Sequence, residues 1–463
     1  MATRPLVLIH GYSDRGKSFK RWVEVLQSRG YDVHDIRVSN YQSLTNEITI
    51  KDIAEGLDRA LRVTAGLEDD QPFDAIVHST GGLVIRAWLT AYQGRADRLK
   101  HLIMLAPANF GSPMAHKGRS WLGAIFKGGK ELGPDFLEAG DRILSGLELG
   151  SSFSWDLAHS DLVGPDTYYG PTKRTPYAFV LIGTSDYGWL RRAVTEPGTD
   201  GTVRWSGAGL NCRKIVIDLT RDPARPENAN RISIGGWSNT DMPFVLVDGV
   251  NHGTIMSSPP DSLVDLVQSA LNVSSRREFD AWCASNATTP ATARVTRWQQ
   301  FVVRAVDERG DPVPDYFLEF YSLGTKGRER VIEEISLDVH TFRDDPSFRC
   351  FHVDLDALKP ERLPNLYMRV RASSGTDFVA YFGYGSHGPP VAADGNRGNL
   401  WDAEVDLTDV LQQEPDTKGR TASFFYPYTT TLVELRLNRE PLPLSGVSKV
   451  LQLYRAEELW EGR

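Results

Sequence analysis

Cysteine is scarce in this 463-residue chain, which has only Cys212, Cys283 and Cys350. The three residues are far apart and form no CxxC pair. They therefore predict neither a disulfide framework nor a cysteine-based metal site. The odd number fits a reducing compartment, or a protein that does not depend on disulfides.

Long hydrophobic runs are also missing. No segment approaches the ~20 apolar residues that a helix needs to cross a bilayer. Residues Met1–Pro5 lead directly into Leu6–Ile9, which we interpret as the first core strand and not as part of a signal peptide. The expected localisation is cytoplasmic by default, and export without a cleaved signal stays open.

Positive charge is in short supply. The chain has 52 Lys and Arg against 60 Asp and Glu, a net charge of −8, and no basic run. We expect no nucleic-acid partner on this ground. Hydrophobic residues at 41% and charged residues at 24% are typical of globular proteins, which excludes a disordered, collagen-like or coiled-coil chain. The length predicts two or three domains.

The first unit, residues 1–275, alternates short apolar runs with helical patterns. This alternation predicts a mostly parallel sheet with helices on both faces. The predicted strands are Leu6–Ile9, Tyr31–Val38, Phe73–Val77, Leu102–Leu105, Tyr177–Ile182, Ile215–Ile217 and Phe244–Val247. The predicted helices are Ser18–Arg29, Ile50–Ala65, Gly82–Tyr92 and Asp261–Leu271.

The composition changes after this unit. Residues 276–295 are predicted to be a linker, because Ser285–Thr292 is small and polar. From 296 to 463 the apolar residues alternate with period 2 between turn signals, as in Phe301, Val303 and Ala305. This pattern predicts an all-β sandwich. We expect an independently folded accessory module that serves recognition, surface docking or stabilisation.

A candidate nucleophile, Ser79, follows the strand Phe73–Val77. The sequence Val77-His78-Ser79-Thr80-Gly81-Gly82 then opens a helix. This strand–turn–helix context is that of a nucleophile elbow, in which the serine hydroxyl stands above the sheet. The helix N-terminus favours developing negative charge. The alternative is an ordinary turn that Ser79 caps.

A nucleophilic serine needs a histidine base. Four histidines follow Ser79 within the first unit: His101, His116, His159 and His252. His101 begins a strand and is expected to face solvent, and two others lie inside an insertion of about residues 112–176. His252 directly follows the last strand, at the edge where the base should be, and is our candidate.

The base needs an orienting carboxylate, and two aspartates compete for this role. Asp200 lies in Asp200-Gly201-Thr202-Val203, on a tight glycine turn that returns to extended chain. Asp186 follows the strand Tyr177–Ile182. We prefer Asp200 and keep Asp186 as the alternative. Asp248 is too close in sequence to His252 to be its partner.

The oxyanion of acyl transfer needs two backbone N–H donors. One is expected from Thr80, the residue after the nucleophile. The other is expected from the loop after the first strand, where Tyr12 is our candidate. His10 in the same loop is interpreted as structural.

Together these segments resemble α/β-hydrolases of the lipase/esterase type. The signatures occur in the expected order: His10-Gly11, His78-Ser79-Thr80-Gly81-Gly82, Asp200-Gly201-Thr202-Val203 and Asn251-His252. Ala106–Pro113 resembles the strand-end segment of bacterial lipases and lecithin–cholesterol acyltransferase-like enzymes. One departure is Val77, which stands where the elbow has its first glycine. The resemblance covers about residues 5–272 and implies an α/β-hydrolase fold with a lid at about 112–176 and a Ser79–His252–Asp200 triad.

The function expected from this set is hydrolysis of carboxylic esters, with lipid or acyl esters favoured, through an acyl-enzyme. No metal or cofactor is required by this chemistry. The insertion contains an apolar cluster, Trp121, Leu122, Ile125 and Phe126, that either packs as core or moves at a lipid surface. Two alternatives stay open: acyl transfer to an alcohol by the same acyl-enzyme, and a catalytically silent scaffold with a β recognition domain.

Overall fold

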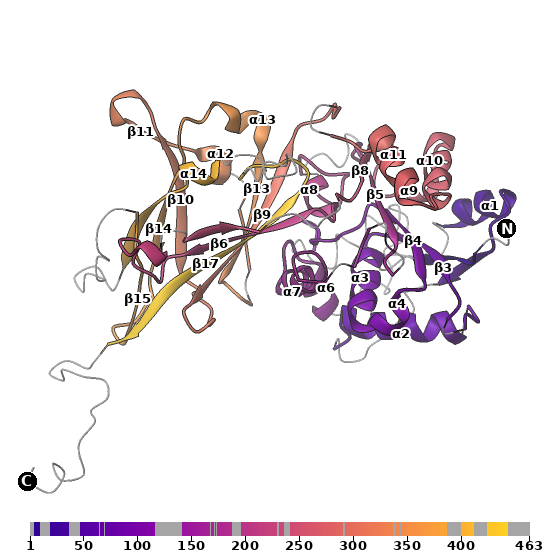
Figure 1. Ribbon diagram of the computed structural model, residues 1–463, viewed down its shortest axis with the longest axis horizontal. Coiled ribbons are helices and arrows are strands. Elements are labelled where there is room, and N and C mark those ends of the chain that lie inside the picture. The colour runs from indigo at the N-terminus through magenta and orange to yellow at the C-terminus, as the bar shows by residue number, and fades with distance from the viewer. Residues whose placement is uncertain are drawn as a thin grey trace, which may run out of the picture.

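The computed structural model describes the ranges 4–9, 19–36, 47–63, 65–68, 70–115, 141–166, 168–170, 172, 174–187, 196–228, 231–235, 241–289, 292–336, 339–342, 344–386, 400–411 and 424–442. An α/β part and a β-rich part lie side by side (Figure 1). Within these ranges, every helix is too short or too polar to cross a lipid bilayer.

The α/β part is built on a sheet whose six described strands follow the order β2-β1-β3-β4-β5-β8. All neighbours in it are parallel. The strands are β1 Leu6–Ile9, β2 Val33–Ile36, β3 Phe73–His78, β4 Leu99–Leu105, β5 Tyr177–Gly183 and β8 Phe244–Val247. The predicted parallel sheet is confirmed, and the central strands β1 and β3 are buried along their whole length.

Helices cover both faces of this sheet (Figure 1). On one face α3 packs against both α2 and α7, and on the other α1 packs on α9 while α10 packs on β4. The helices are α1 Lys20–Ser28, α2 Ile50–Val63, α3 Gly81–Ala91, α4 Gln93–Ala96, α6 Asp141–Leu147, α7 Ser152–Asp161, α8 Trp205–Ala208, α9 Thr254–Ser257, α10 Asp261–Leu271 and α11 Arg276–Asn286. Helices α6 and α7 belong to the insertion predicted at about 112–176.

The β-rich part contains two facing sheets. One has the order β11-β10-β14-β16, and the other β12-β13-β9-β17-β6-β7, with β15 paired to β17. The strands are β6 Cys212–Asp218, β7 Ile232–Ile234, β9 Trp298–Asp307, β10 Tyr316–Leu323, β11 Glu329–Val331, β12 Val339–Thr341, β13 Phe348–Asp354, β14 Tyr367–Ala372, β15 Val379–Phe382, β16 Trp401–Asp406 and β17 Thr430–Pro441. Short helices α12 Glu333–Ser336, α13 Leu355–Leu358 and α14 Thr408–Leu411 join them.

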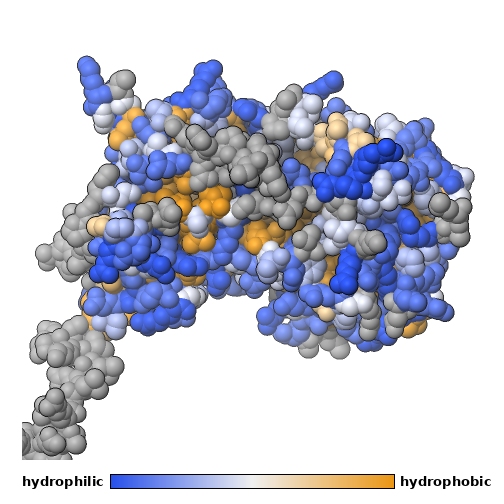
Figure 2. Space-filling model, in the orientation of Figure 1, coloured by the Kyte–Doolittle hydropathy of each residue, from blue (hydrophilic) through white to orange (hydrophobic). Residues whose placement is uncertain are grey.

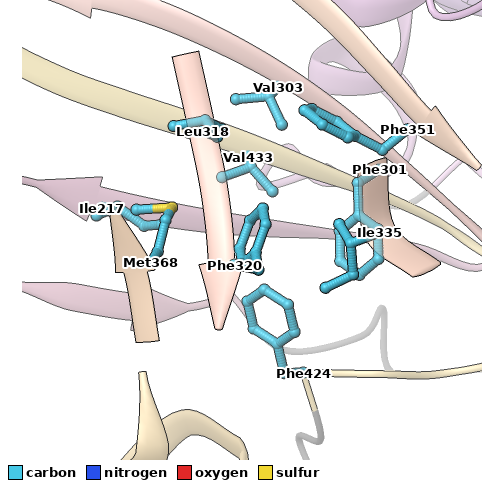
Figure 3. Close-up of a pocket in the computed structure, with 10 residues that line it drawn as sticks. All are labelled: Ile217, Phe301, Val303, Leu318, Phe320, Ile335, Phe351, Met368, Phe424 and Val433. Carbon is cyan, nitrogen blue, oxygen red and sulfur yellow. The ribbon is translucent and has the colours of Figure 1, made fainter. Parts of the chain in front are cut away.

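A second hydrophobic core fills the space between these two sheets. Figure 3 shows side chains from both sheets turned toward one another around a small cavity of about 20 Å³. All residues that line it are apolar: Ile217, Phe301, Val303, Leu318, Phe320, Ile335, Phe351, Met368, Phe424 and Val433. A space of this size holds about one water and no acyl chain. The sandwich interior is therefore packed core.

The boundary between the two parts differs from the predicted division at residues 275 and 296. Strands β6 and β7 lie within residues 1–275, yet β6 pairs with β17, the last strand of the β-rich part. The side chains of Ile215 and Ile217 are at most 1% exposed and belong to the sandwich core. The sequence pattern identified β6 as a strand, but it carries no signal for the sheet in which a strand pairs.

The two parts also share one hydrophobic core, contrary to the prediction of an independently folded module. Residues of β9, β13 and β17 are buried together with the core of the α/β part. Two ring contacts cross the boundary: Tyr428 stacks on Phe244 with centroids 5.8 Å apart, and Phe348 meets Trp155 edge-on at 5.5 Å. Aromatic side chains of the β-rich part thus contribute to the core that the two parts share.

The predicted linker, residues 276–295, begins with a helix and not with flexible chain. Helix α11 buries Phe279 and Trp282, whose rings lie 5.5 and 4.6 Å from that of Phe179 on β5. Its N-cap Ser275 accepts a hydrogen bond from the backbone N–H of Glu278. The small polar stretch at 285–292 pointed to a linker, but the apolar residues just before it have helical spacing.

The surface of the β-rich part is the more apolar of the two on the face that Figure 2 shows, where hydrophobic residues gather near its centre and toward the boundary. Most of the exposed large hydrophobic side chains in the described ranges also belong to this part: Phe317, Val331, Val339, Phe378 and Leu400. The helices of the α/β part present mainly hydrophilic residues on that face.

Candidate active site

Ser79 lies in a strained turn between β3 and α3. Its φ angle is +53°, a left-handed conformation that is costly for a residue with a Cβ. Three backbone hydrogen bonds hold the turn: Ser79 N–H donates to the carbonyl of Leu105 (3.3 Å), and the Ser79 carbonyl accepts from Gly82 (3.0 Å) and Ala108 (3.1 Å). The end of β4 thus fixes the conformation of this serine.

Gly82, three residues after Ser79, is required because the chain here lies very close to the segment after β4. A Cβ at position 82 would lie 2.8 Å from the Cβ of Pro107 and 3.0 Å from Oδ1 of Asn109. The helix can therefore begin against the segment after β4 only with glycine here. Val77, which departs from the nucleophile-elbow pattern, is fully buried within β3 and leaves this turn intact.

His252 reaches Ser79 from the loop after β8. Its Nε2 lies 3.1 Å from the Ser79 Oγ, and its Nδ1 lies 2.9 Å from Oδ2 of Asp200. The loop is shaped by Asn251, whose side-chain oxygen accepts from the N–H groups of Gly253 (3.0 Å) and Thr254 (2.9 Å). All three triad candidates are at most 3% exposed.

Asp200 is held by backbone groups of its own turn. Its Oδ1 accepts hydrogen bonds from the N–H groups of Thr202 (3.0 Å) and Val203 (2.8 Å), which leaves Oδ2 for the imidazole. The backbone carbonyl of Asp200 also accepts from the N–H of His252, at 3.0 Å. Charge-assisted bonds to both oxygens satisfy this buried carboxylate.

The competing acids lie elsewhere. The described contacts place the Asp186 carbonyl 3.3 Å from the side-chain nitrogen of Asn251, and Oδ1 of Asp248 3.2 Å from the hydroxyl of Thr184. Asp186 therefore supports the loop of the histidine through its backbone. Asp200 is the carboxylate whose contact with the His252 imidazole the structure describes.

The competing histidines have structural contacts. His101 was expected to face solvent, which is wrong: it is 2% exposed, and its ring nitrogens lie 2.7 Å from Asp74 Oδ1 and 2.6 Å from the carbonyl of Val273. Helix α10 and its continuation cover that end of β4. His159 lies on α7, where its Nδ1 donates to the carbonyl of Trp155 (2.8 Å), and burial lowers its pKa. His116 is outside the described residues.

The oxyanion donors are placed only in part. Thr80 is the N-cap residue of α3 and is 2% exposed. Tyr12 and His10 lie outside the described residues, as do the apolar residues Trp121, Leu122, Ile125 and Phe126 of the insertion. Within the described ranges no cluster of three or more His, Cys, Asp or Glu side chains could hold a metal ion.

A buried ion pair behind the nucleophile was not predicted from the sequence. The guanidinium of Arg86 on α3 binds both carboxylate oxygens of Asp161 on α7, at 2.8 and 2.9 Å, and donates to the carbonyl of Asn109 at 2.7 Å. Tyr169 donates to the same carboxylate at 2.6 Å. The signal in the sequence was a lone charged residue inside the apolar helix Gly82-Leu83-Val84-Ile85-Arg86-Ala87-Trp88.

Burial by itself lowers the pKa of Arg86, but the charge and hydrogen bonds of Asp161 outweigh burial and hold that pKa above its ordinary value. Burial and the neighbouring Asp161 raise the pKa of Tyr169 well above 10. At neutral pH the guanidinium is therefore charged and the phenol is neutral. It ties the helix behind Ser79 to the segment after β4 and to the insertion.

The parallel sheet, the left-handed serine turn after β3 and the histidine loop after β8 are the features of an α/β-hydrolase fold. Residues 5–118 match the model of the palmitoyl protein thioesterase family. None of the curated proteins matches the chain in sequence.

Solved structures extend this likeness over the whole chain. Phospholipase PlaB from Legionella pneumophila is 23% identical, with 98% of each chain covered and a TM-score of 0.71. A complex of that phospholipase with thio-NAD matches equally well. The mature lipase BlEst2 from Bacillus licheniformis is 16% identical, with 59% of this chain and 93% of that chain covered and a TM-score of 0.37. The similarity to the phospholipase shows that the combination of an α/β-hydrolase fold with this β-rich part recurs.

Proposed function

We propose that the protein is a serine hydrolase that cleaves ester bonds through an acyl-enzyme on Ser79. The observation that carries the proposal is the hydrogen-bond chain from Ser79 Oγ through both nitrogens of His252 to Asp200, with distances of 3.1 and 2.9 Å. A serine alone is a weak nucleophile, and this arrangement supplies the base and the group that orients it.

In the proposed reaction Ser79 Oγ attacks the carbonyl carbon of the substrate, and its proton moves to Nε2 of His252. The carboxylate of Asp200 accepts a hydrogen bond from the Nδ1–H of His252 and so stabilises the imidazolium. The N–H of Thr80, with a second donor proposed at Tyr12, binds the oxyanion. The imidazolium then protonates the leaving alcohol or thiol. A water molecule, activated by the same base, hydrolyses the acyl-enzyme and restores Ser79.

The proposed substrates are lipid or acyl esters, including thioesters. The match of residues 5–118 to a palmitoyl protein thioesterase family supports an acyl group on either oxygen or sulfur. The overall likeness to a protein named as a phospholipase supports a lipid ester. Contact with a lipid surface through the insertion at about 112–176 is part of the proposal, since four large apolar residues occur together at 121–126.

The decisive experiment combines active-site labelling with a substrate series. A fluorophosphonate probe should label the wild-type protein on Ser79 and leave Ser79→Ala unlabelled. Nitrophenyl esters and acyl thioesters of increasing chain length, each with and without phospholipid vesicles, then define the substrate. A folded wild-type protein that neither reacts with the probe nor hydrolyses any member of the series would be a binding scaffold and would refute the proposal.

A further inference from the structure

The loop that carries Asp200 lies between the two parts of the protein. It begins near Glu196, turns at Asp200 and passes through α8, and the chain then enters the sandwich as β6. Asp200 itself is completely buried, and every residue of α8 is at least largely buried. The position of the carboxylate therefore depends on packing from both sides.

The α/β part holds one side of this loop. The hydroxyl of Ser112 donates to the carbonyl of Thr202 at 2.6 Å, and the N–H of Phe110 donates to the carbonyl of Gly207 at 2.9 Å. Both donors belong to the segment after β4, which also fixes the Ser79 turn. This side connects the acid to the nucleophile through a single stretch of backbone.

The β-rich part holds the other side through Thr430. Its hydroxyl donates to the carbonyl of Ser206 in α8 at 2.9 Å and accepts from the side-chain amide of Gln300 at 3.3 Å. Thr430 and Gln300 are direct neighbours across β17 and β9, and both are at most 1% exposed. A side chain from the sheet thus hydrogen-bonds to the loop six residues after the acid.

Trp298 of β9 packs against the same loop at Gly198, two residues before Asp200. A Cβ at position 198 would lie 2.8 Å from the indole ring of Trp298, and Gly198 has a φ of +72°. The indole is itself fixed by stacking on His352 of β13, with centroids 4.3 Å apart. Backbone on both sides of Asp200 therefore rests on residues of the β-rich part.

We propose that Thr430 and Trp298 are positioning residues for Asp200, which makes the β-rich part a component of the active site. The inference rests on the proposed function, in which Asp200 orients His252. The site excludes water, so no water molecule can bridge the imidazole and a displaced carboxylate. Small displacements of catalytic groups strongly reduce the rate.

The chain offers a matched control for Thr430. Thr431 is the next residue of β17, is also fully buried, and points to the sandwich side, where its hydroxyl accepts from the amide of Gln299 at 3.0 Å. Thr430→Val and Thr431→Val thus delete equivalent buried hydroxyls on opposite faces of one strand. Thr430→Ser keeps the hydroxyl and should restore activity.

We expect Thr430→Val to lower kcat roughly tenfold with little change in KM, because it acts on the geometry of the reacting groups and not on substrate binding. Thr431→Val should keep kcat within about twofold of wild type. Its thermal midpoint should fall by about as much as that of Thr430→Val. Equal losses of kcat in the two variants, at equal thermal midpoints, would overturn the inference. Trp298→Phe provides a second variant of the same side.

A double-mutant cycle with Asp200→Asn separates positioning from general stability. If Thr430 acts through the Asp200 carboxylate, Thr430→Val should change the residual kcat of Asp200→Asn by less than about twofold, whereas the effects on thermal midpoint should add. The same tenfold loss in both backgrounds would contradict the inference. If Ser79→Ala keeps wild-type activity, it is the proposed function that fails.

Discussion

The imidazole Nε2 of His252 lies 3.1 Å from the hydroxyl oxygen of Ser79, although 173 residues separate them in the sequence. The contact depends on the two loops that leave β3 and β8, strands at different positions of one parallel sheet. Because the carboxyl ends of parallel strands lie at the same edge, the sheet itself brings the serine and the histidine together.

The first prediction concerns the nucleophile. Ser79→Ala removes one oxygen and keeps the Cβ that already tolerates the left-handed turn, so the fold and the thermal midpoint should stay close to wild type. Turnover of esters should fall by several decades, roughly the loss seen when a triad member is removed. Ser160→Ala, on the exposed side of α7, is the matched control and should leave the rate unchanged. Substantial esterase activity in folded Ser79→Ala would exclude the mechanism.

The second prediction compares three carboxylates. Asp200→Asn keeps the size of the side chain but removes the charge that faces His252, so the rate should fall about a thousandfold or more. Asp186→Asn and Asp248→Asn should each cost less than about tenfold, because Asp186 supports Asn251 through its backbone carbonyl, which the substitution keeps, and Asp248 bonds to the hydroxyl of Thr184. The rates of the three variants on one soluble ester decide the matter, and a reversed order would identify a different acid.

The third prediction concerns the buried pair Arg86–Asp161. Arg86→Met leaves the carboxylate of Asp161 buried without its cation and should lower the free energy of unfolding by about 3–5 kcal/mol. The double variant Arg86→Met with Asp161→Leu removes the unpaired charge and should recover part of that loss. Urea denaturation at pH 7 measures both. A single variant within about 1 kcal/mol of wild type would show that the pair contributes little.

The fourth prediction concerns truncation. A chain that ends at Thr289 keeps β6 but loses β17, its neighbour in the sheet, and exposes the buried side chains of Ile215 and Ile217. Such an unpaired apolar strand edge favours aggregation, so residues 1–289 should be insoluble when expressed alone. Coexpression with residues 290–463 should restore soluble protein. Soluble and monomeric residues 1–289 would show instead that the α/β part is autonomous.

The fifth prediction concerns alkaline pH. Burial raises the pKa of Cys212 from 9.0 to about 12. As pH rises, the unfolded state therefore loses the proton of this thiol before the folded state does. The contribution of the neutral Cys212 thiol to the free energy of unfolding is complete below pH 9 and disappears as pH rises toward 12. The full effect is about 4 kcal/mol. Cys212→Ala should show a flatter decline of unfolding free energy between pH 9 and 11. Parallel curves for the two proteins would mean that Cys212 is not the responsible group.

Much of the α/β part could be predicted because its signals are local. Strand β8 and helix α10 have the predicted bounds. The turn is predictable because only Ser79 and Thr80 lie between the strand and the helix. The sequence favours Asp200 over Asp186 because a glycine turn places a carboxylate at a fixed point, and the structure brings Asp200 to His252.

The errors concern relations between distant segments. Periodicity identifies Ile215–Ile217 as strand but says nothing about its pairing with residues 430–436, so β6 was assigned to the wrong part. His101 was expected at the surface because the helix that covers it follows more than 150 residues later in the chain. The sequence does not reveal the role of Arg86, because its partner Asp161 lies on another helix, in an insertion whose sequence has no clear period.

The pairing of β6 with β17 sets an order of events during synthesis. Lys214 of β6 and Glu434 of β17, which are joined by an ion pair of 2.6 Å, lie 220 residues apart. At typical rates of translation β6 leaves the ribosome roughly 10 to 40 seconds before its partner. Throughout that interval its apolar face is open to other chains and to chaperones. The nascent polypeptide can complete neither sheet of the sandwich nor the support of Asp200 until nearly all of it has been made.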